Sequence, residues 1–187
     1  EDFSNLTYLD CSGGNQIDTL DLSQNPTLTY LNCSGDGWIF KQILSLNISQ
    51  NTALSHLNCN STLLSQLDLS QNPNLTFLDC MDTELQILDL SHNIGLLNLD
   101  CGNNMWGDFD NTNQLTNLDL SQNINLTSIN CYGNALSNLD LRNGNNTNIG
   151  YFNSGNNDSL FCISVDDSTW SVNNWTDIAV SYTHLRA

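Results

Sequence analysis

Residues 75–101 read LTFLDCMDTELQILDLSHNIGLLNLDC, and this stretch decides the fold. It holds two Leu-x-Cys phrases, LTFLDC and LLNLDC, on either side of one Leu-Asp-Leu phrase, QILDLSHN. In each phrase two apolar residues flank a polar one, which is the alternation of a short strand with one buried face. A single copy cannot bury its own apolar stripe, so the stretch needs copies of itself above and below.

The same two phrases alternate along most of the chain. The Leu-x-Cys phrase recurs at intervals of 22, 26, 21, 21 and 30 residues, at Cys11, Cys33, Cys59, Cys80, Cys101 and Cys131. Phrases of the LDLSQN type lie between them, and a seventh, degenerate unit carries Phe152 and Ile163 at the inward positions. The aligned unit, LxxLxCxxNxLxxLDLSxNxx, predicts a mainly β solenoid of about seven coils, with two short parallel strands in each coil and little helix.

This unit resembles the leucine-rich repeat, in particular the nested 21-residue bacterial class (IRREKO type) found in secreted proteins of the Bacteroidetes. The resemblance covers roughly residues 6–165 and implies a coil that is right-handed, as parallel crossovers are. We expect a solenoid over 1–165 without an N-terminal cap, a capping segment over 166–180, and a tail over 181–187 that is not native. Because the chain opens inside a repeat phrase, we expect it to be a fragment of a longer parent chain.

Composition narrows the possible partners. The chain has 20 acidic residues and three basic ones, which gives a formal charge of −17. This charge repels nucleic-acid phosphates and anionic membrane surfaces, so neither is an expected partner. No apolar run is long enough to span a bilayer, so membrane insertion is not expected either.

The recurrent Cys and Asn positions have structural interpretations. The six repeat cysteines fall in the inward column, where we expect reduced thiols packed as small apolar residues. A column on one side cannot surround a zinc ion, which excludes a zinc site. A recurrent Asn can bond the turn backbone of stacked coils, and in the Leu-Asp-Leu half it is present at Asn25, Asn51, Asn72, Asn93 and Asn123. In the Cys half we assign this position to Asn104, Asn134 and Asn157, with Asp36, Thr62 and Thr83 as weaker substitutes.

Two outward columns of Asp and Asn lie between the inward residues. Four consecutive acids in one of them are expected about one rung apart, at Asp68, Asp89, Asp119 and Asp140. Like charges at this spacing repel unless they are screened or bridged, and oxygen ligands suit calcium. A flat column offers fewer than the roughly six to eight converging oxygens that calcium takes. We therefore favour a solvated face, with weak Ca²⁺ binding as the alternative and no other cofactor.

Two insertions leave the coil after the Cys strand and carry aromatic residues. One follows Cys33 and contains Trp38 and Phe40; the other follows Cys101 and contains Trp106 and Phe109; Tyr132 begins the corresponding turn of the sixth coil. Insertions in repeat proteins map to one face, often the one that binds a ligand. These five aromatics are therefore candidate ligand contacts. The alternative is that the loops fold back and bury them over the solenoid edge.

Together these features predict a scaffold without catalysis that binds a protein or a glycan at the bacterial surface or outside the cell. No phrase pairs a nucleophile with a base, and His56 and His92 stand alone in the sequence, so we expect no enzyme. Two alternatives are a non-catalytic repeat segment of a larger secreted enzyme and a calcium-stabilised structural stalk. The extracellular location follows from the resemblance and from the acidic, lysine-poor composition.

Overall fold

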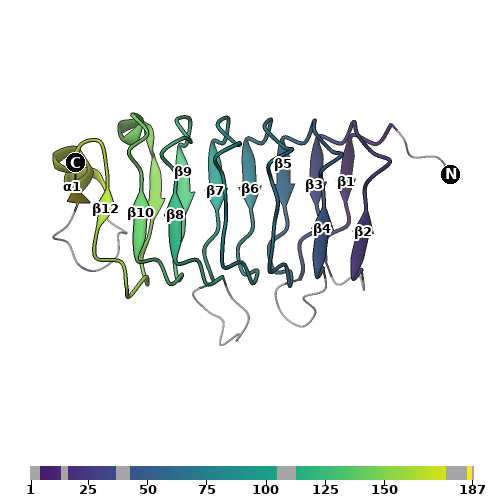
Figure 1. The fold of residues 1–187 in the computed structure, drawn as a ribbon, viewed down its shortest axis with the longest axis horizontal. Coiled ribbons are helices and arrows are strands. Elements are labelled where there is room, and N and C mark those ends of the chain that lie inside the picture. Colours follow the sequence, from purple (N-terminus) through teal and green to yellow (C-terminus); the bar gives the residue numbers. More distant parts are fainter. Residues whose placement is uncertain (1–4, 14–16, 37–42, 105–112, 176–184, 187) are drawn as a thin grey trace.

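The computed structural model is an elongated parallel β-solenoid with β1 at one end and α1 at the other (Figure 1). It describes residues 5–13, 17–36, 43–104, 113–175 and 185–186. The strands on one side of the coils form a continuous seven-stranded sheet in the order β1-β3-β5-β6-β7-β9-β11. Their bounds are β1 Tyr8–Asp10, β3 Tyr30–Asn32, β5 His56–Asn58, β6 Phe77–Asp79, β7 Asn98–Asp100, β9 Ser128–Asn130 and β11 Tyr151–Asn153.

The strands on the opposite side form two smaller sheets. One pairs β2 (Thr19–Asp21) with β4 (Ser45–Asn47). The other has the order β13-β12-β10-β8, with β8 Asn117–Asp119, β10 Asn138–Asp140, β12 Ile163–Ser164 and β13 Leu185–Arg186.

The prediction of two strands in every coil is correct for the first side but not for the second. Residues 66–69 and 87–90 adopt no strand, so the second side is interrupted at two coils. An open groove lined by Gln66, Asp68, Ile87 and Asp89 lies between these segments. The coils remain paired on the seven-stranded side, and just before these segments they are joined by single backbone hydrogen bonds, such as Glu84 N–H to the Leu64 carbonyl at 2.9 Å.

The interior is built from the recurrent Leu and Cys residues, as the repeat predicts. The middle residue of the central strands is buried, for example Leu31, Leu57 and Leu78, and each lies beside its equivalent in the next coil. Cys11 and Cys162 are half-buried, and the other five cysteines are buried. Burial raises the pKa of the Cys33 and Cys131 thiols to about 12, so these side chains pack as neutral apolar groups.

The asparagines of the Leu-Asp-Leu half join neighbouring coils. The Nδ2 atoms of Asn51, Asn72, Asn93 and Asn123 each donate to two backbone carbonyls of the preceding coil. These carbonyls lie in turns where strand pairing cannot supply a donor. The asparagine side chains therefore tie the turns together, as the sequence predicts.

The assignment of Asn104 to the Cys-half column is wrong. Asn104 is exposed, and Asn113 takes the position, donating through Nδ2 to the carbonyls of Cys80 and Cys101. Asn134 and Asn157 bond the carbonyls of Cys101 and Cys131 in the same way. The inserted residues fall between Cys101 and the column, so the position must be counted back from the following Leu115.

The last coil ends in a short helix, α1 (Ser168–Asn174), within the expected capping segment. Asp167 caps it by accepting a hydrogen bond from the backbone N–H of Trp170. Trp175, at the end of the helix, is buried against Phe152 of the last coil, with ring centroids 4.6 Å apart. The other helical element is the 3-10 turn η1 (Asn146–Asn148). Within the described ranges, no helix is long and apolar enough to cross a membrane.

Candidate ligand-binding face

The outward face of the seven-stranded sheet carries two columns of side chains. Each strand has three residues; the middle one points inward, and the first and third point outward. Because the strands pair in register, equivalent outward residues line up from coil to coil. The first positions are Tyr8, Tyr30, His56, Phe77, Asn98, Ser128 and Tyr151, and the third positions are Asp10, Asn32, Asn58, Asp79, Asp100, Asn130 and Asn153.

Four of the first positions form a continuous stack of rings, called here the aromatic column: Tyr8, Tyr30, His56 and Phe77. Successive ring centroids lie 4.2, 4.3 and 4.1 Å apart, with interplanar angles of 10°, 11° and 7°. The rung spacing of ~4.8 Å in a parallel sheet places the rings at this separation. The rings stand parallel, so each inner ring has both faces covered by its neighbours.

The stack changes the protonation of its members. Burial lowers the pKa of His56, because desolvation disfavours the imidazolium. Burial also raises the pKa of Tyr30, and a hydrogen bond with the Tyr8 side chain adds to this rise. His56 is therefore held toward its neutral form between Tyr30 and Phe77.

The third positions form a second column, called here the acid–amide column. Its side-chain oxygens accept the backbone N–H two residues later, as in Asn32 to Ser34 and Asp79 to Met81. The amides also bridge coils: Asn32 Nδ2 donates to Asp10 at 3.2 Å and Asn130 Nδ2 to Asp100 at 3.0 Å. The same residues thus fix the turn after each strand and link one coil to the next.

The acids of this column differ in burial and therefore in pKa. Asp10 is exposed, and hydrogen bonds from the side chain and backbone of Ser12 lower its pKa. Asp79 and Asp100 lie on neighbouring strands, and burial raises the pKa of both, against the lowering effect of their hydrogen bonds. Two partly desolvated carboxylates therefore lie side by side, Asp79 on the strand of the last aromatic ring and Asp100 on the next strand.

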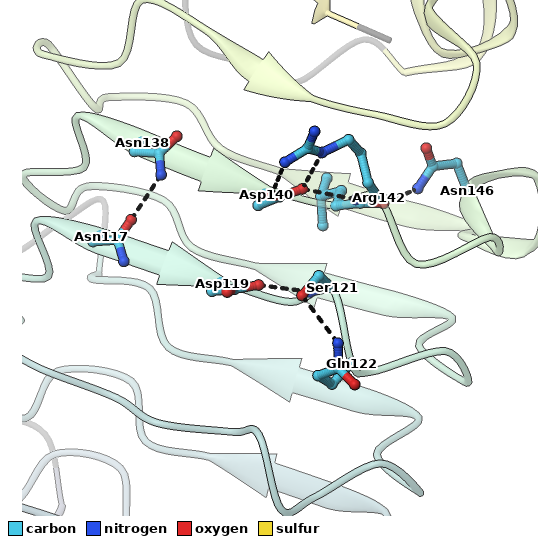
Figure 2. Close-up of polar contacts among 9 residues, drawn as sticks. Asn117, Asp119, Ser121, Gln122, Asn138, Asp140, Arg142 and Asn146 are labelled. Atoms are coloured by element: carbon cyan, nitrogen blue, oxygen red, sulfur yellow. Dashed lines mark hydrogen bonds and ion pairs between the residues drawn. The ribbon is translucent and has the colours of Figure 1, made fainter.

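The four acids predicted as a calcium ladder lie on the second side of the solenoid. Asp119 and Asp140 are on the paired strands β8 and β10, and Figure 2 shows them with their hydrogen-bond partners. Asp68, Asp89 and Asp119 each accept the backbone N–H of the serine two residues later at 2.9 Å. These bonds lower the pKa of Asp68 and Asp89. The acids thus shape their own turns.

Asp140 differs from the other three because it has a cationic partner. Arg142 donates to it from the backbone N–H at 3.0 Å and from Nε at 2.9 Å, and its second guanidinium contact closes an ion pair (Figure 2). The Arg142 side chain lowers the pKa of Asp140. Across the residues that the structure describes, no three His, Cys, Asp or Glu side chains gather as metal ligands. Calcium binding by these acids stays a prediction.

Four predicted aromatic contacts, Trp38, Phe40, Trp106 and Phe109, lie outside the described residues. The fifth, Tyr132, is half-buried. Its ring carbon Cδ2 lies 3.2 Å from the point that a Cβ atom on Gly155 would occupy, so the ring packs over this glycine of the next coil. The structure does not bring Tyr132 to the aromatic column, because it belongs to the turn after β9.

The sequence interpretation missed the aromatic column. It treated His56 as a residue that stands alone, and this is wrong, because His56 is the third ring of the stack. The signal was present in the residue before the inward Leu of each Cys phrase, which reads Tyr, Tyr, His and Phe in the first four phrases. Aligning the outward positions of successive units would have revealed it.

No family model matches this sequence, and no curated protein matches it. Among solved structures, 27 chains match. One is described as the functional domain of InlJ from Listeria monocytogenes, which includes a cysteine ladder; it is 31% identical in sequence, with a TM-score of 0.69. The match covers 86% of this chain but only 36% of that chain. The comparison supports a leucine-rich-repeat type of solenoid with cysteines in its interior.

Proposed function

We propose that this chain is a non-catalytic binding scaffold that acts at the bacterial surface or outside the cell. The ligand, a protein or a glycan, would lie on the outward face of the seven-stranded sheet. The observation that carries this proposal is the in-register pairing of the seven strands, which lines the aromatic column up beside the acid–amide column. A rigid sheet that presents aligned aromatic and polar groups suits recognition, because little ordering is needed on binding.

The similarity to the InlJ domain supports a repeat scaffold, and the choice of face comes from the outward side chains of this chain. Aromatic residues are enriched where proteins bind their ligands, and an exposed Tyr presents both apolar area and a hydroxyl. Tyr8 is 56% exposed at one end of the column.

The test is a binding screen with two matched variants. The wild type is screened against a glycan array and a peptide array, and every hit is measured again with Tyr8→Ala and with Ile87→Ala. Ile87 is 78% exposed on the second side, so its removal takes away apolar area far from the proposed face. We expect hits to be weakened by Tyr8→Ala and kept by Ile87→Ala. Hits that weaken only with Ile87→Ala would place the ligand on the other side and refute the proposal.

A further inference from the structure

The charges on the seven-stranded face have one sign. The face carries the carboxylates of Asp10, Asp79 and Asp100, and its strands contain no Lys or Arg. Of the three basic residues in the chain, Arg142 pairs with Asp140 on the second side and Arg186 lies in β13 of another sheet. The third, Lys41, lies outside the described residues. The face is therefore complementary to a positively charged ligand.

Asp79 and Asp100 strengthen this complementarity. Both carboxylates are partly withdrawn from water, and their hydrogen bonds come from neutral donors: Asn60 and Met81 for Asp79, and Asn130 and Gly102 for Asp100. Withdrawing a carboxylate from water without an opposite charge costs free energy, which an ammonium or guanidinium group would recover. A cation placed above these neighbouring rungs would contact both acids.

The geometry of the aromatic column disfavours a sugar. A sugar that packs against a ring uses the face of the ring, but both faces of Tyr30 and His56 are covered by their neighbours at 4.1–4.3 Å. Phe77, the last ring, has Asn98 of β7 beside it in the register, and Tyr8, the first ring, is 56% exposed. The inner part of the column presents ring edges, which suit the methylene stems of long basic side chains.

Resting on the proposed function, we infer that this face binds an extended, lysine- and arginine-rich segment of a partner protein. The segment crosses the strands, from Asp10 on β1 to Asp100 on β7. Four rungs at ~4.8 Å span about 19 Å, which is the length of roughly six extended residues. The methylene stems of the ligand pack along the aromatic column, and its cationic groups reach the acid–amide column. The net charge of −17 steers such a segment toward the chain.

The experiment uses two triple variants that change the net charge equally. The face variant is Asp10→Asn, Asp79→Asn and Asp100→Asn; asparagine already occupies the same column at Asn32, Asn58 and Asn130. The control variant is Asp18→Asn, Asp21→Asn and Asp158→Asn, three exposed acids away from the seven-stranded sheet. The probes are an eight-residue peptide that alternates Lys or Arg with Ser, the same peptide with Glu in place of the bases, and cellohexaose. Titration calorimetry at two salt concentrations measures the affinities, and thermal melting checks folding.

We expect the wild type to bind the basic peptide, with an affinity that falls as salt rises. The face variant should bind it about tenfold more weakly and the control variant within about twofold of the wild type. Equal losses of affinity in the two variants would show that net charge alone attracts the peptide, and would overturn the inference. A wild type that does not bind the basic peptide would also overturn it.

The outcomes also separate this inference from the function on which it rests. If cellohexaose binds and Tyr8→Ala abolishes that binding, the ligand face is correct and the basic segment is the wrong occupant. If the substitutions on this face weaken the binding of none of the array hits and none of the probes, the proposed function fails as well.

Discussion

Tyr30 and His56 stack face to face, with ring centroids 4.3 Å apart and an interplanar angle of 11°, although they come from different coils. The pairing of β3 with β5 sets this contact, because it places Tyr30 directly beside His56 in the register. The stack is therefore a consequence of the repeat, and it also links coils through their outer surface. Its contribution to stability can be separated from that of the buried leucines.

Replacing His56 with Ala should remove two ring contacts at once, those with Tyr30 and Phe77. Stacked aromatic pairs contribute about 0.5–1.5 kcal/mol each, so we expect the free energy of unfolding to fall by about 1–3 kcal/mol. Asn98→Ala is the matched control, because Asn98 occupies the same strand position on β7. Urea unfolding followed by circular dichroism measures both, and equal losses in the two variants would mean that the stack adds nothing.

His56 should also make stability depend on pH. Burial lowers its pKa in the folded chain, so between this value and the unfolded value near 6.5 the unfolded chain binds more protons. The contribution of His56 to the free energy of unfolding is therefore complete above about pH 6.5 and is lost as the pH falls through the folded pKa. His56→Phe keeps an aromatic ring but cannot titrate. Relative to this variant, the wild type should lose stability in urea melts between pH 7 and 5; a constant difference would contradict the lowered pKa.

Asp100→Asn should stabilise the protein at neutral pH. Burial raises the pKa of Asp100. Between the unfolded value of about 3.8 and the folded pKa, the folded chain therefore binds more protons than the unfolded chain, and stability is lost as the pH rises through this range. The amide of Asn has no charge to desolvate, and its oxygen can still accept the hydrogen bond from Asn130. We expect a gain on the order of 1 kcal/mol at pH 7 and little difference at pH 3, measured by thermal melting. Asp21→Asn, which removes a carboxylate of lowered pKa, should not stabilise at pH 7.

Asn93 tests the ties between coils. Its Nδ2 atom donates to the carbonyls of Leu69 and Asn72, and the side chain is fully buried. Asn93→Ala removes both bonds, so we expect a loss of about 2–3 kcal/mol in the free energy of unfolding. Asn74→Ala removes one exposed bond to the carbonyl of Thr52 and should cost about 0.5 kcal/mol or less. Similar losses in the two variants would show that burial of the amide does not matter.

The interior of the fold could be predicted from the sequence because its residues repeat almost unchanged. Leu78 and Cys80 recur as Leu57 and Cys59 one unit earlier, so the spacing of the inward residues can be read directly from the sequence. The interrupted second side could not be predicted in this way, since the phrases there keep the same pattern as those that form strands. Whether they pair depends on the spacing between coils.

Only one of the two columns on the candidate face could be predicted from the sequence. The acid–amide column was recognised because Asp and Asn alternate with inward residues, whereas the aromatic column was missed because Tyr, His and Phe vary at an outward position. The pattern also placed Asn104 where Asn113 belongs, because an insertion shifts the count from Cys101. Outward contacts depend on register, which only the paired strands reveal.

Calcium should leave the melting temperature unchanged. The acids predicted to bind it, Asp68, Asp89, Asp119 and Asp140, already accept hydrogen bonds in their own turns, and Asp140 is paired with Arg142. A ligand that binds only the folded chain raises stability by mass action, so calcium at a real site would shift the melting temperature with concentration. We expect no shift between a chelator and millimolar Ca²⁺. A rise that Asp89→Asn abolishes would instead establish the ladder as a calcium site, since this change removes its central charge without removing the turn bond.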